Sequence, residues 1–530
     1  MGKNINSVVS YGDFGQINSF TNTIGNKTDT ISYTYDDFYR IKSRNLNGME
    51  DSTEYTYLKG QNGQDTTLVE SFNNSKETYS YEYDQYGNII SVYKEGILTE
   101  EYEYDDLNQL VWAKIGEDEY AYTYALDNSS NLEFVYKNGT IIKTYGYMPA
   151  GETWVDKLNS FTGTAINYDE IGNPLNWRNG MTFSWEYGRR LKTVTADGNN
   201  ISYTYDADGL RTSKTVNGVK TEYYWLDGVL QGQKTGSEYI IFLYDENGTA
   251  YGMLINQNGV ENYYYYLFNL QGDIVGIMDS NGNTVAEYTY DAWGQLLTTT
   301  GTLKDTIGQK NPLRYRGYYY DSETEFYYLK SRYYDPYVQR FINADGYAST
   351  GQGLTGYNMY AYCNNNPVNM TDETGLSPKR IWRFVKKLVD ISAQIACISA
   401  DPLGRTLSVV AHYNRNQFNN DDYSEEELKN NYQPEPPSSD KFHQNNQVNN
   451  MRNRKYVIGE WFSSEVVYYS NGTINNSPED IGTFNVYSGD NRFLNVVVHG
   501  CFDVMPYIFW GNSLDDSTTI IDRIILVFGE

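Results

Sequence analysis

Histidine and cysteine are scarce in this chain of 530 residues, which has only three of each. The cysteines are odd in number and contain no C-x-x-C pair, so they cannot build a disulfide framework and lack the spacing of a structural zinc site. No stretch of about 18 apolar residues exists, and the first residues lack the apolar segment of a secretory signal. We therefore predict no metal, no cofactor and no stable membrane span.

Basic residues are also few. The chain has 41 lysines and arginines against 68 aspartates and glutamates, a formal net charge of −27. Contact with nucleic-acid phosphates needs clustered positive charge, so we do not expect DNA or RNA to bind along the whole chain. Tyrosine is abundant instead, with 55 residues in a 16% aromatic fraction. Because disordered chains are poor in aromatic residues, this composition argues against disorder.

The tyrosines recur in a Tyr-x-Tyr-Asp unit that is followed by a turn. Tyrosines two residues apart point to one face of a strand, where aromatic pairs stabilise a sheet. The aspartate can start the turn by bonding to nearby backbone, and a following glycine or asparagine accepts a positive φ. Such hairpins must stack on neighbours to bury their aromatic face. An ordinary β-sandwich is the alternative, but the pattern recurs over about 260 residues. The clearest copies start at Tyr33, Tyr81, Tyr102, Tyr203 and Tyr288.

A second tyrosine-rich pattern follows the repeats. It reads LRYRGYYYD at residues 313–321, FYYLKSRYYDP at 326–336, RFINAD at 340–345 and NMYAYCNNNPVN at 358–369. Together with the repeats, it resembles the YD-repeat proteins of the Rhs type, the C components of insecticidal toxin complexes and the animal teneurins. The second pattern is similar to the Rhs-repeat-associated core domain. The resemblance covers residues 30–376.

The resemblance implies a mainly β fold with a small α+β domain at its end. YD-repeat hairpins would form a spiral that makes a hollow shell. We expect this shell at residues 1–300, as an N-terminally partial copy, and the core at 301–376, where it would seal one end. A helical segment with a proline-rich linker is expected at 377–439, and a strand-rich, toxin-like domain at 440–530.

A short motif at the end of the core resembles the Asp-Pro-x-Gly-Leu sequence after which related chains cut themselves. It reads DETGL at residues 372–376, so Glu373 stands where related chains have proline. Two neighbouring carboxyls can share a proton, so that one acts as a base toward water and the other as an acid. By resemblance, Asp372 is one of them and the bond after Leu376 is cut, with Asp345 as the nearest upstream candidate for the second. The alternative is a simple turn that leads into the tail.

Composition changes after residue 376. Only 8 of the 55 tyrosines lie beyond it, whereas all three histidines do. Residues 377–380 resemble a helix start, and the apolar positions up to residue 398 have helical spacing, which suits either a membrane-surface helix or one packed on protein. Further elements are expected as a helix at 424–429, strands at 456–458, 465–469 and 495–498, and a hairpin turn at 470–473.

The tail also holds residues suited to acid–base chemistry on a phosphate ester. His443 with Glu460 could supply the general acid and base, while Lys441, Arg454 and Lys455 could hold phosphate and stabilise the transition state. This set is typical of a metal-independent ribonuclease. The alternative is an exposed loop histidine beside a solvated basic turn.

These features predict an Rhs-type polymorphic toxin. We expect the shell to enclose a C-terminal effector and deliver it in competition between bacteria. The expected partners are a cognate immunity protein and a target-cell macromolecule, which is RNA under the ribonuclease hypothesis. The expected location is outside the cell or on the surface of a bacterium. The alternative is a non-enzymatic cell-surface protein whose repeats serve adhesion by binding surface glycans.

Overall fold

The computed structural model describes residues 5–12, 15–46, 51–60, 63–125, 129–147, 154–346, 354–376, 378–380, 432–433, 451–458, 462–469 and 484–486. Contacts divide the chain into two compact units, Met1–Ser392 and Ala393–Glu530. Within the described residues, no helix is long and apolar enough to cross a membrane.

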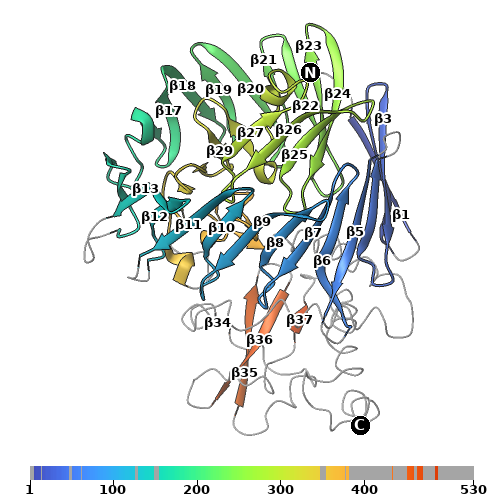
Figure 1. The fold of residues 1–530 in the computed structure, drawn as a ribbon, viewed down its shortest axis with the longest axis horizontal. Helices are drawn as coiled ribbons and strands as arrows, with labels where there is room; N and C mark the ends of the chain where they lie inside the picture. The colour runs from blue at the N-terminus through green and yellow to red at the C-terminus, as the bar shows by residue number, and fades with distance from the viewer. Residues whose placement is uncertain are drawn as a thin grey trace. The chain divides into compact units, whose positions relative to one another are not determined.

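Two large antiparallel sheets make up most of the first unit (Figure 1). In both sheets each strand pairs with the next strand in the chain, so the sheets extend hairpin by hairpin. The first sheet has 15 strands: β1 (Ile5–Tyr11), β2 (Ile17–Ile24), β3 (Lys27–Tyr35), β4 (Ile41–Leu46), β5 (Asp51–Lys59), β6 (Asp65–Asn74), β7 (Thr78–Tyr83), β8 (Ile89–Lys94), β9 (Ile97–Tyr104), β10 (Leu110–Ile115), β11 (Asp118–Tyr124), β12 (Leu132–Lys137), β13 (Thr140–Tyr147), β14 (Leu158–Phe161) and β15 (Thr164–Ala165).

The second sheet has 12 strands and follows a single 3-10 turn, η1 (Arg178–Gly180). Its strands are β16 (Thr182–Glu186), β17 (Arg190–Ala196), β18 (Asn199–Tyr205), β19 (Arg211–Val216), β20 (Val219–Leu226), β21 (Val229–Thr235), β22 (Glu238–Tyr244), β23 (Ala250–Gln257), β24 (Val260–Phe268), β25 (Ile274–Asp279), β26 (Thr284–Tyr290) and β27 (Leu296–Thr300).

The second tyrosine of each repeat ties its hairpin to the preceding one. Its hydroxyl donates to a backbone carbonyl 14–18 residues earlier, as in Tyr35 to Ile17 and Tyr205 to Leu191, both at 2.7 Å. Because a buried phenol hydroxyl needs a partner, this position favours tyrosine over phenylalanine. The same bond is made by Tyr57, Tyr83, Tyr104, Tyr124, Tyr244 and Tyr290, and by the indole nitrogen of Trp225.

The aspartate of each repeat folds the turn that follows it. Oδ1 of Asp84 accepts hydrogen bonds from the backbone N–H groups of Tyr86 and Asn88, both at 2.8 Å. Gly87, between them, has a φ of 77°, which is unfavourable for a residue with a side chain. The predicted turn chemistry is therefore confirmed. The same pair of bonds forms at Asp36, Asp105, Asp169, Asp245, Asp279 and Asp291.

Strands β22–β25 are buried on both faces. In β22, Ile240 and Phe242 join the main apolar cluster, which also contains side chains of the core segment at residues 301–376. Ile241 and Leu243 join a second cluster with β2–β4 of the first sheet. Successive side chains of a strand point to opposite faces. These four strands of the second sheet are therefore covered by the core segment on one face and by the first strands of the chain on the other.

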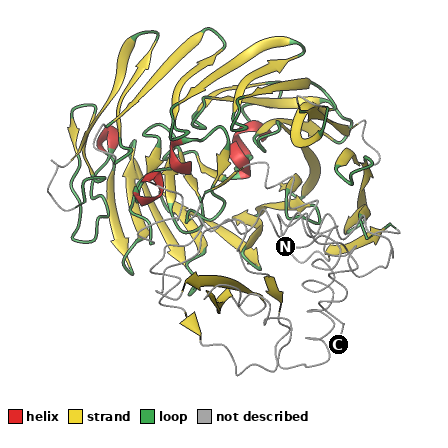
Figure 2. Cartoon of the chain, turned by 90° about the horizontal axis from the view of Figure 1, so that it is seen from below, coloured by secondary structure: helices red, strands yellow, loops and turns green. Residues whose placement is uncertain are grey.

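The core segment itself has short elements joined by ordered loops. Figure 2 shows its helices as short turns among the strands. They are α1 (Ile307–Lys310), η2 (Tyr315–Gly317), η3 (Leu354–Tyr357) and η4 (Cys363–Asn365). A small four-stranded sheet contains β28 (Tyr319–Asp321), β29 (Phe326–Tyr328), β30 (Tyr333–Asp335) and β31 (Arg340–Phe341), and a separate pair contains β32 (Met370–Thr371) and β33 (Lys379–Arg380).

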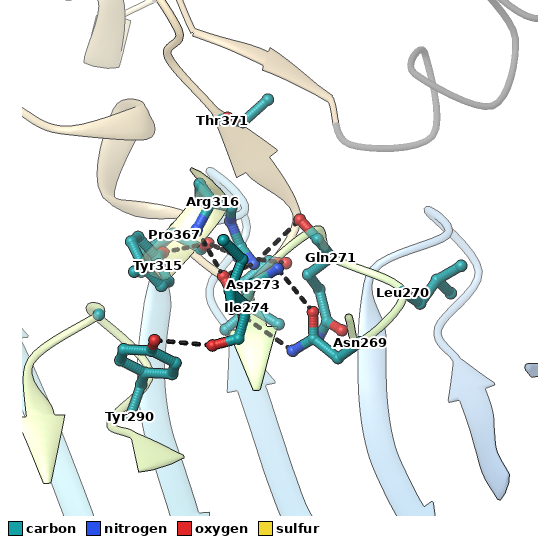
Figure 3. Close-up of polar contacts among 12 residues, drawn as sticks. Asn269, Leu270, Gln271, Asp273, Ile274, Tyr290, Tyr315, Arg316, Pro367 and Thr371 are labelled. Atoms are coloured by element: carbon teal, nitrogen blue, oxygen red, sulfur yellow. Dashed lines mark hydrogen bonds and ion pairs between the residues drawn. The ribbon is translucent and has the colours of Figure 1, made fainter. Parts of the chain in front are cut away.

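Buried ion pairs fasten the core segment to the repeats. Figure 3 shows one of them, in which Arg316 Nη1 lies 2.8 Å from Asp273 Oδ1 and the same guanidinium donates to the Pro367 carbonyl at 2.5 Å. Removing one partner from such a pair costs several kcal/mol, since it leaves a buried charge uncompensated. The arginines and aspartates of the core motif therefore have a structural role. Two further pairs are Arg178–Asp335 and Arg211–Asp321.

The described part of the second unit is a four-stranded antiparallel sheet. Its strands, in order, are β34 (Tyr432–Gln433), β35 (Met451–Ile458), β36 (Phe462–Tyr469) and β37 (Phe484–Val486). The strands predicted at 456–458 and 465–469 lie within β35 and β36. The helices predicted at 381–398 and 424–429, the strand at 495–498 and the turn at 470–473 lie outside the described residues.

The predicted mainly β fold of stacked YD-repeat hairpins is confirmed, but the predicted helix start at residues 377–380 is wrong. Lys379 and Arg380 form β33 and pair with Thr371 and Met370 of β32. Local helix signals carry no information about the backbone groups that another segment offers for pairing, and tertiary pairing outweighs weak propensity.

Candidate self-cleavage site

Arg332 is the centre of a buried polar cluster at the end of the core segment. Its side chain is 4% exposed, and its Nη2 lies 2.7 Å from Asp345 Oδ2 and 3.7 Å from Asp372 Oδ2. Nη1 donates to the Met359 carbonyl at 3.0 Å, and Nε donates to the Gly375 carbonyl. The structure thus brings the two predicted carboxylates to one cation, and that cation also binds the backbone one residue before Leu376.

Asp345 is fixed by segments that are distant in sequence. It follows β31, and its backbone N–H donates to the Met359 carbonyl at 2.9 Å. Arg189, at the start of the second sheet, donates through Nη1 to the Ala344 carbonyl at 2.7 Å and to the Asp345 carbonyl. The position of this carboxylate therefore depends on the second sheet as well as on Arg332.

Asp372 closes a tight turn just before the bond that is predicted to be cut. Its backbone N–H donates to the Tyr318 hydroxyl at 2.7 Å. Its Oδ1 accepts from the N–H groups of Gly375 at 2.9 Å and Leu376 at 3.2 Å. Because β32 and β33 pair Thr371 with Lys379, the chain reverses between these residues, and Leu376 lies within that reversal.

Gly375 is required by the close packing of this turn. Its φ is 71°, and an added Cβ would lie 2.8 Å from Ser331 Oγ and 2.9 Å from the Leu329 carbonyl oxygen. The same Ser331 hydroxyl donates to the Thr374 carbonyl at 2.6 Å. The side chain of Glu373, which stands where related chains have proline, is exposed. The chain therefore matches the related motif at the closely packed Gly375 and differs from it at the exposed residue Glu373.

The cluster joins one buried cation to two carboxylates. Burial lowers the pKa of Arg332 from its ordinary value, while Asp345 and Asp372 act in the opposite direction. A guanidinium stays protonated at neutral pH, so Arg332 offers a fixed positive charge to both carboxylates. Among the described residues, no group of three or more His, Cys, Asp or Glu side chains is placed to bind a metal ion.

A cavity of about 350 Å³ lies beside Leu376. The second sheet contributes Arg189, Arg190 and Tyr205 to its walls, and the core segment contributes Lys330. Burial lowers the pKa of Lys330. The cavity is large enough for water and small solutes to reach Leu376.

Sequence reasoning misses three residues of this cluster. Arg332 lies in the tyrosine-rich run at 326–336, where nothing distinguishes it from the structural arginines around it. Tyr318 lies in a run of tyrosines for the same reason, and Arg189 lies more than 140 residues before the motif that it supports. Only the long-range hydrogen bonds identify them.

The structure describes only two of the five residues that are predicted for the effector. Arg454 and Lys455 lie on β35, where they pair in register with Val466 and Glu465 of β36. Lys441, His443 and Glu460 lie outside the described residues. The catalytic group of the tail therefore stays a prediction.

Comparison with known proteins places the repeats in a recognised group. A family model described as the teneurin YD-shell matches residues 232–368. The tRNA nuclease WapA of Bacillus subtilis is 34% identical over 230 residues, a match that covers 42% of this chain and 9% of WapA. The double-stranded DNA deaminase toxin A of Burkholderia cenocepacia is 27% identical over 267 residues, covering 42% of this chain and 17% of that protein. The chain thus spans only a small part of the relatives that it matches.

The crystal structure of TcdB2-TccC3-Cdc42 has the same fold over most of the chain, with a TM-score of 0.57, 21% identity, and coverage of 74% of this chain and 21% of that one. The stacked hairpins and the core segment define a YD-repeat shell protein. The family match and the relatives agree with this fold, and they support grouping the repeats and the core segment with the Rhs/YD-repeat proteins.

Proposed function

We propose that this chain is the shell and effector part of an Rhs-type toxin, and that it cuts itself after Leu376 to free the effector. The observation that carries the proposal is the placement of Asp345 and Asp372 at one buried guanidinium, beside the turn that holds Leu376. A cluster that served only to close a turn would not need a second buried carboxylate on the same cation, because burying charge is costly.

The proposed reaction is hydrolysis of the Leu376–Ser377 peptide bond. One carboxylate removes a proton from water, whose oxygen attacks the carbonyl carbon of Leu376. The other carboxyl gives its proton to the departing nitrogen of Ser377, so the products are a carboxylate at Leu376 and an amine at Ser377. Arg332 holds the Gly375 carbonyl and both acids, which keeps the backbone in place for attack.

A time course of full-length chain made by cell-free translation tests this step. The wild-type chain should yield a fragment that begins at Ser377 by N-terminal sequencing. Asp345→Asn and Asp372→Asn should each stop the cleavage, since either change removes an ionisable group. Asp208→Asn is a matched control, because Asp208 lies in a repeat turn beside the same cavity without being part of the cluster. A fragment that forms at the wild-type rate in both cluster variants would refute the proposal.

For the effector we propose a nuclease that acts on RNA. Its support is the name of one matched relative, a tRNA nuclease, together with the acid–base and phosphate-binding set of His443, Glu460, Lys441, Arg454 and Lys455. The partners would be a cellular RNA in the target and an immunity protein in the producer. The intact protein would act outside the producing cell or at its surface.

Expression of residues 377–530 in the cytoplasm of a test bacterium would check the effector separately. We expect growth to stop and RNA to be degraded, and we expect His443→Ala to restore both. The non-enzymatic alternative, a repeat protein that binds surface glycans, predicts normal growth with either form.

A further inference from the structure

In the hairpin that opens the second sheet, the side chain of Arg189 contacts the cleavage cluster. Arg189 lies at the end of the turn between β16 and β17, after Tyr187 and Gly188, which both have positive φ. Its Nη1 donates to the carbonyls of Ala344 and Asp345.

The turn between β16 and β17 is itself held by the segment that joins the two sheets. The side-chain amide of Asn173 donates to the Gly188 carbonyl at 2.8 Å and to Asp169 Oδ2 at 2.7 Å. Asp169 also closes its own repeat turn. The backbone next to Arg189 is therefore supported by this turn as well as by the β16–β17 hairpin.

From these contacts we infer that Arg189 is a positioning residue that makes self-cleavage dependent on docking of the second sheet. This inference rests on the proposed self-cleavage and adds its regulation. Arg332 and Asp372 belong to the core segment. Arg189, which binds the backbone carbonyl of Asp345, belongs to the second sheet. Before the second sheet docks, Arg332 still binds the Asp345 carboxylate, but the carbonyls of Ala344 and Asp345 lack the bonds from Arg189. Without them the backbone of Asp345 is not fixed for the reaction, so the chain that leads to the effector stays intact.

The expected size of the effect follows from the geometry of catalysis. Misplacing a reacting group by about 1 Å can reduce a rate about a hundredfold. Arg189→Met keeps the aliphatic stem and removes both bonds, so it should slow cleavage by about that factor while the chain still folds. Arg189→Lys, which keeps the charge and one donor group, should have an intermediate rate.

Arg190→Met is the matched control. Arg190 is the adjacent arginine, lines the same cavity, and donates to the carbonyls of Asp206 at 2.9 Å and Ala207 at 3.1 Å, within the sheet. It should therefore leave the cleavage rate unchanged. A rate lowered equally by both variants would show a general loss of structure and would overturn the inference.

Chemical rescue separates positioning from folding. In full-length Arg189→Ala, guanidinium chloride at millimolar concentration should restore part of the cleavage rate, because the cavity beside Leu376 gives a small cation access to the vacated place. Sodium chloride at the same concentration should not. Lack of rescue in a chain that is folded by circular dichroism, or a wild-type rate in Arg189→Met, would overturn the inference while leaving the proposed cleavage intact. A wild-type chain that is never cut would overturn both.

Discussion

The buried tyrosines should make this protein unfold abruptly in alkali. Burial raises the pKa of eleven fully enclosed phenols well above the ordinary value of 10, so they stay protonated in the folded chain. In the unfolded chain they ionise near pH 10, which means that their contribution to stability is complete below pH 10 and is lost as the pH rises above it. They are Tyr81, Tyr102, Tyr122, Tyr145, Tyr203, Tyr223, Tyr266, Tyr318, Tyr327, Tyr334 and Tyr362.

The magnitude follows from linkage. Each of these phenols removes about 1.4 kcal/mol of unfolding free energy per pH unit above 10, so together they remove about 15 kcal/mol per unit. A total stability of about 5–15 kcal/mol would be used up between pH 10 and 11. Phenolate absorbance and circular dichroism, followed together in a pH titration, should change in one steep transition. Tyr187→Phe, which alters a ring that is 85% exposed, should leave the midpoint in place. A gradual rise in phenolate absorbance with unchanged circular dichroism would refute the reasoning.

Asp321→Asn should lower the unfolding free energy by about 3–5 kcal/mol in urea titrations, because it leaves the fully buried Arg211 without its partner; a loss below 1 kcal/mol would show that water reaches the pair. Lys143→Met should stabilise the chain at pH 7 by up to about 3 kcal/mol, since burial lowers the pKa of Lys143 to about 8 and its charge is costly below that pH. The gain should shrink as the pH rises from 8 toward 10.5, and a gain that does not vary with pH would contradict this cause. Gly375→Ala should slow self-cleavage roughly tenfold, because its positive φ and close packing disfavour a side chain; an unchanged rate would show that the turn is not held during the reaction.

Most of the fold can be predicted from local signals. The Tyr-x-Tyr-Asp unit carries its own strand, turn and inter-hairpin bond, so positions such as Tyr205 and Asp84 can be interpreted from a few neighbouring residues. Pairing between strands that are distant in sequence cannot be predicted from local signals. The strand at Lys379–Arg380 forms only because Met370–Thr371 offers a partner, and nothing in its own sequence distinguishes it from a helix start.

Some residues of the cleavage cluster can likewise be identified from local sequence, and others only from long-range contacts. Asp372 and Gly375 can be identified from a contiguous motif, and Asp345 from its place upstream of that motif. Arg332 and Arg189 cannot, because their roles depend on hydrogen bonds to residues that are 43 and 156 positions away. The three-dimensional structure is therefore needed to identify the cation that joins the two acids and the side chain that holds one of them.

The tyrosine bond between successive hairpins also sets an order of assembly. Each hydroxyl reaches back only 14–18 residues, so a hairpin has all of its bonding partners as soon as the next tyrosine has left the ribosome. The pairing between successive hairpins thus uses residues that have already been made, whereas β2–β4 bury their apolar side chains only when β22–β25 follow. The core segment comes after the repeats, and its ion pairs join it to residues made earlier. All of the repeat strands are therefore synthesised before the ribosome makes the core segment, which is expected to seal the shell.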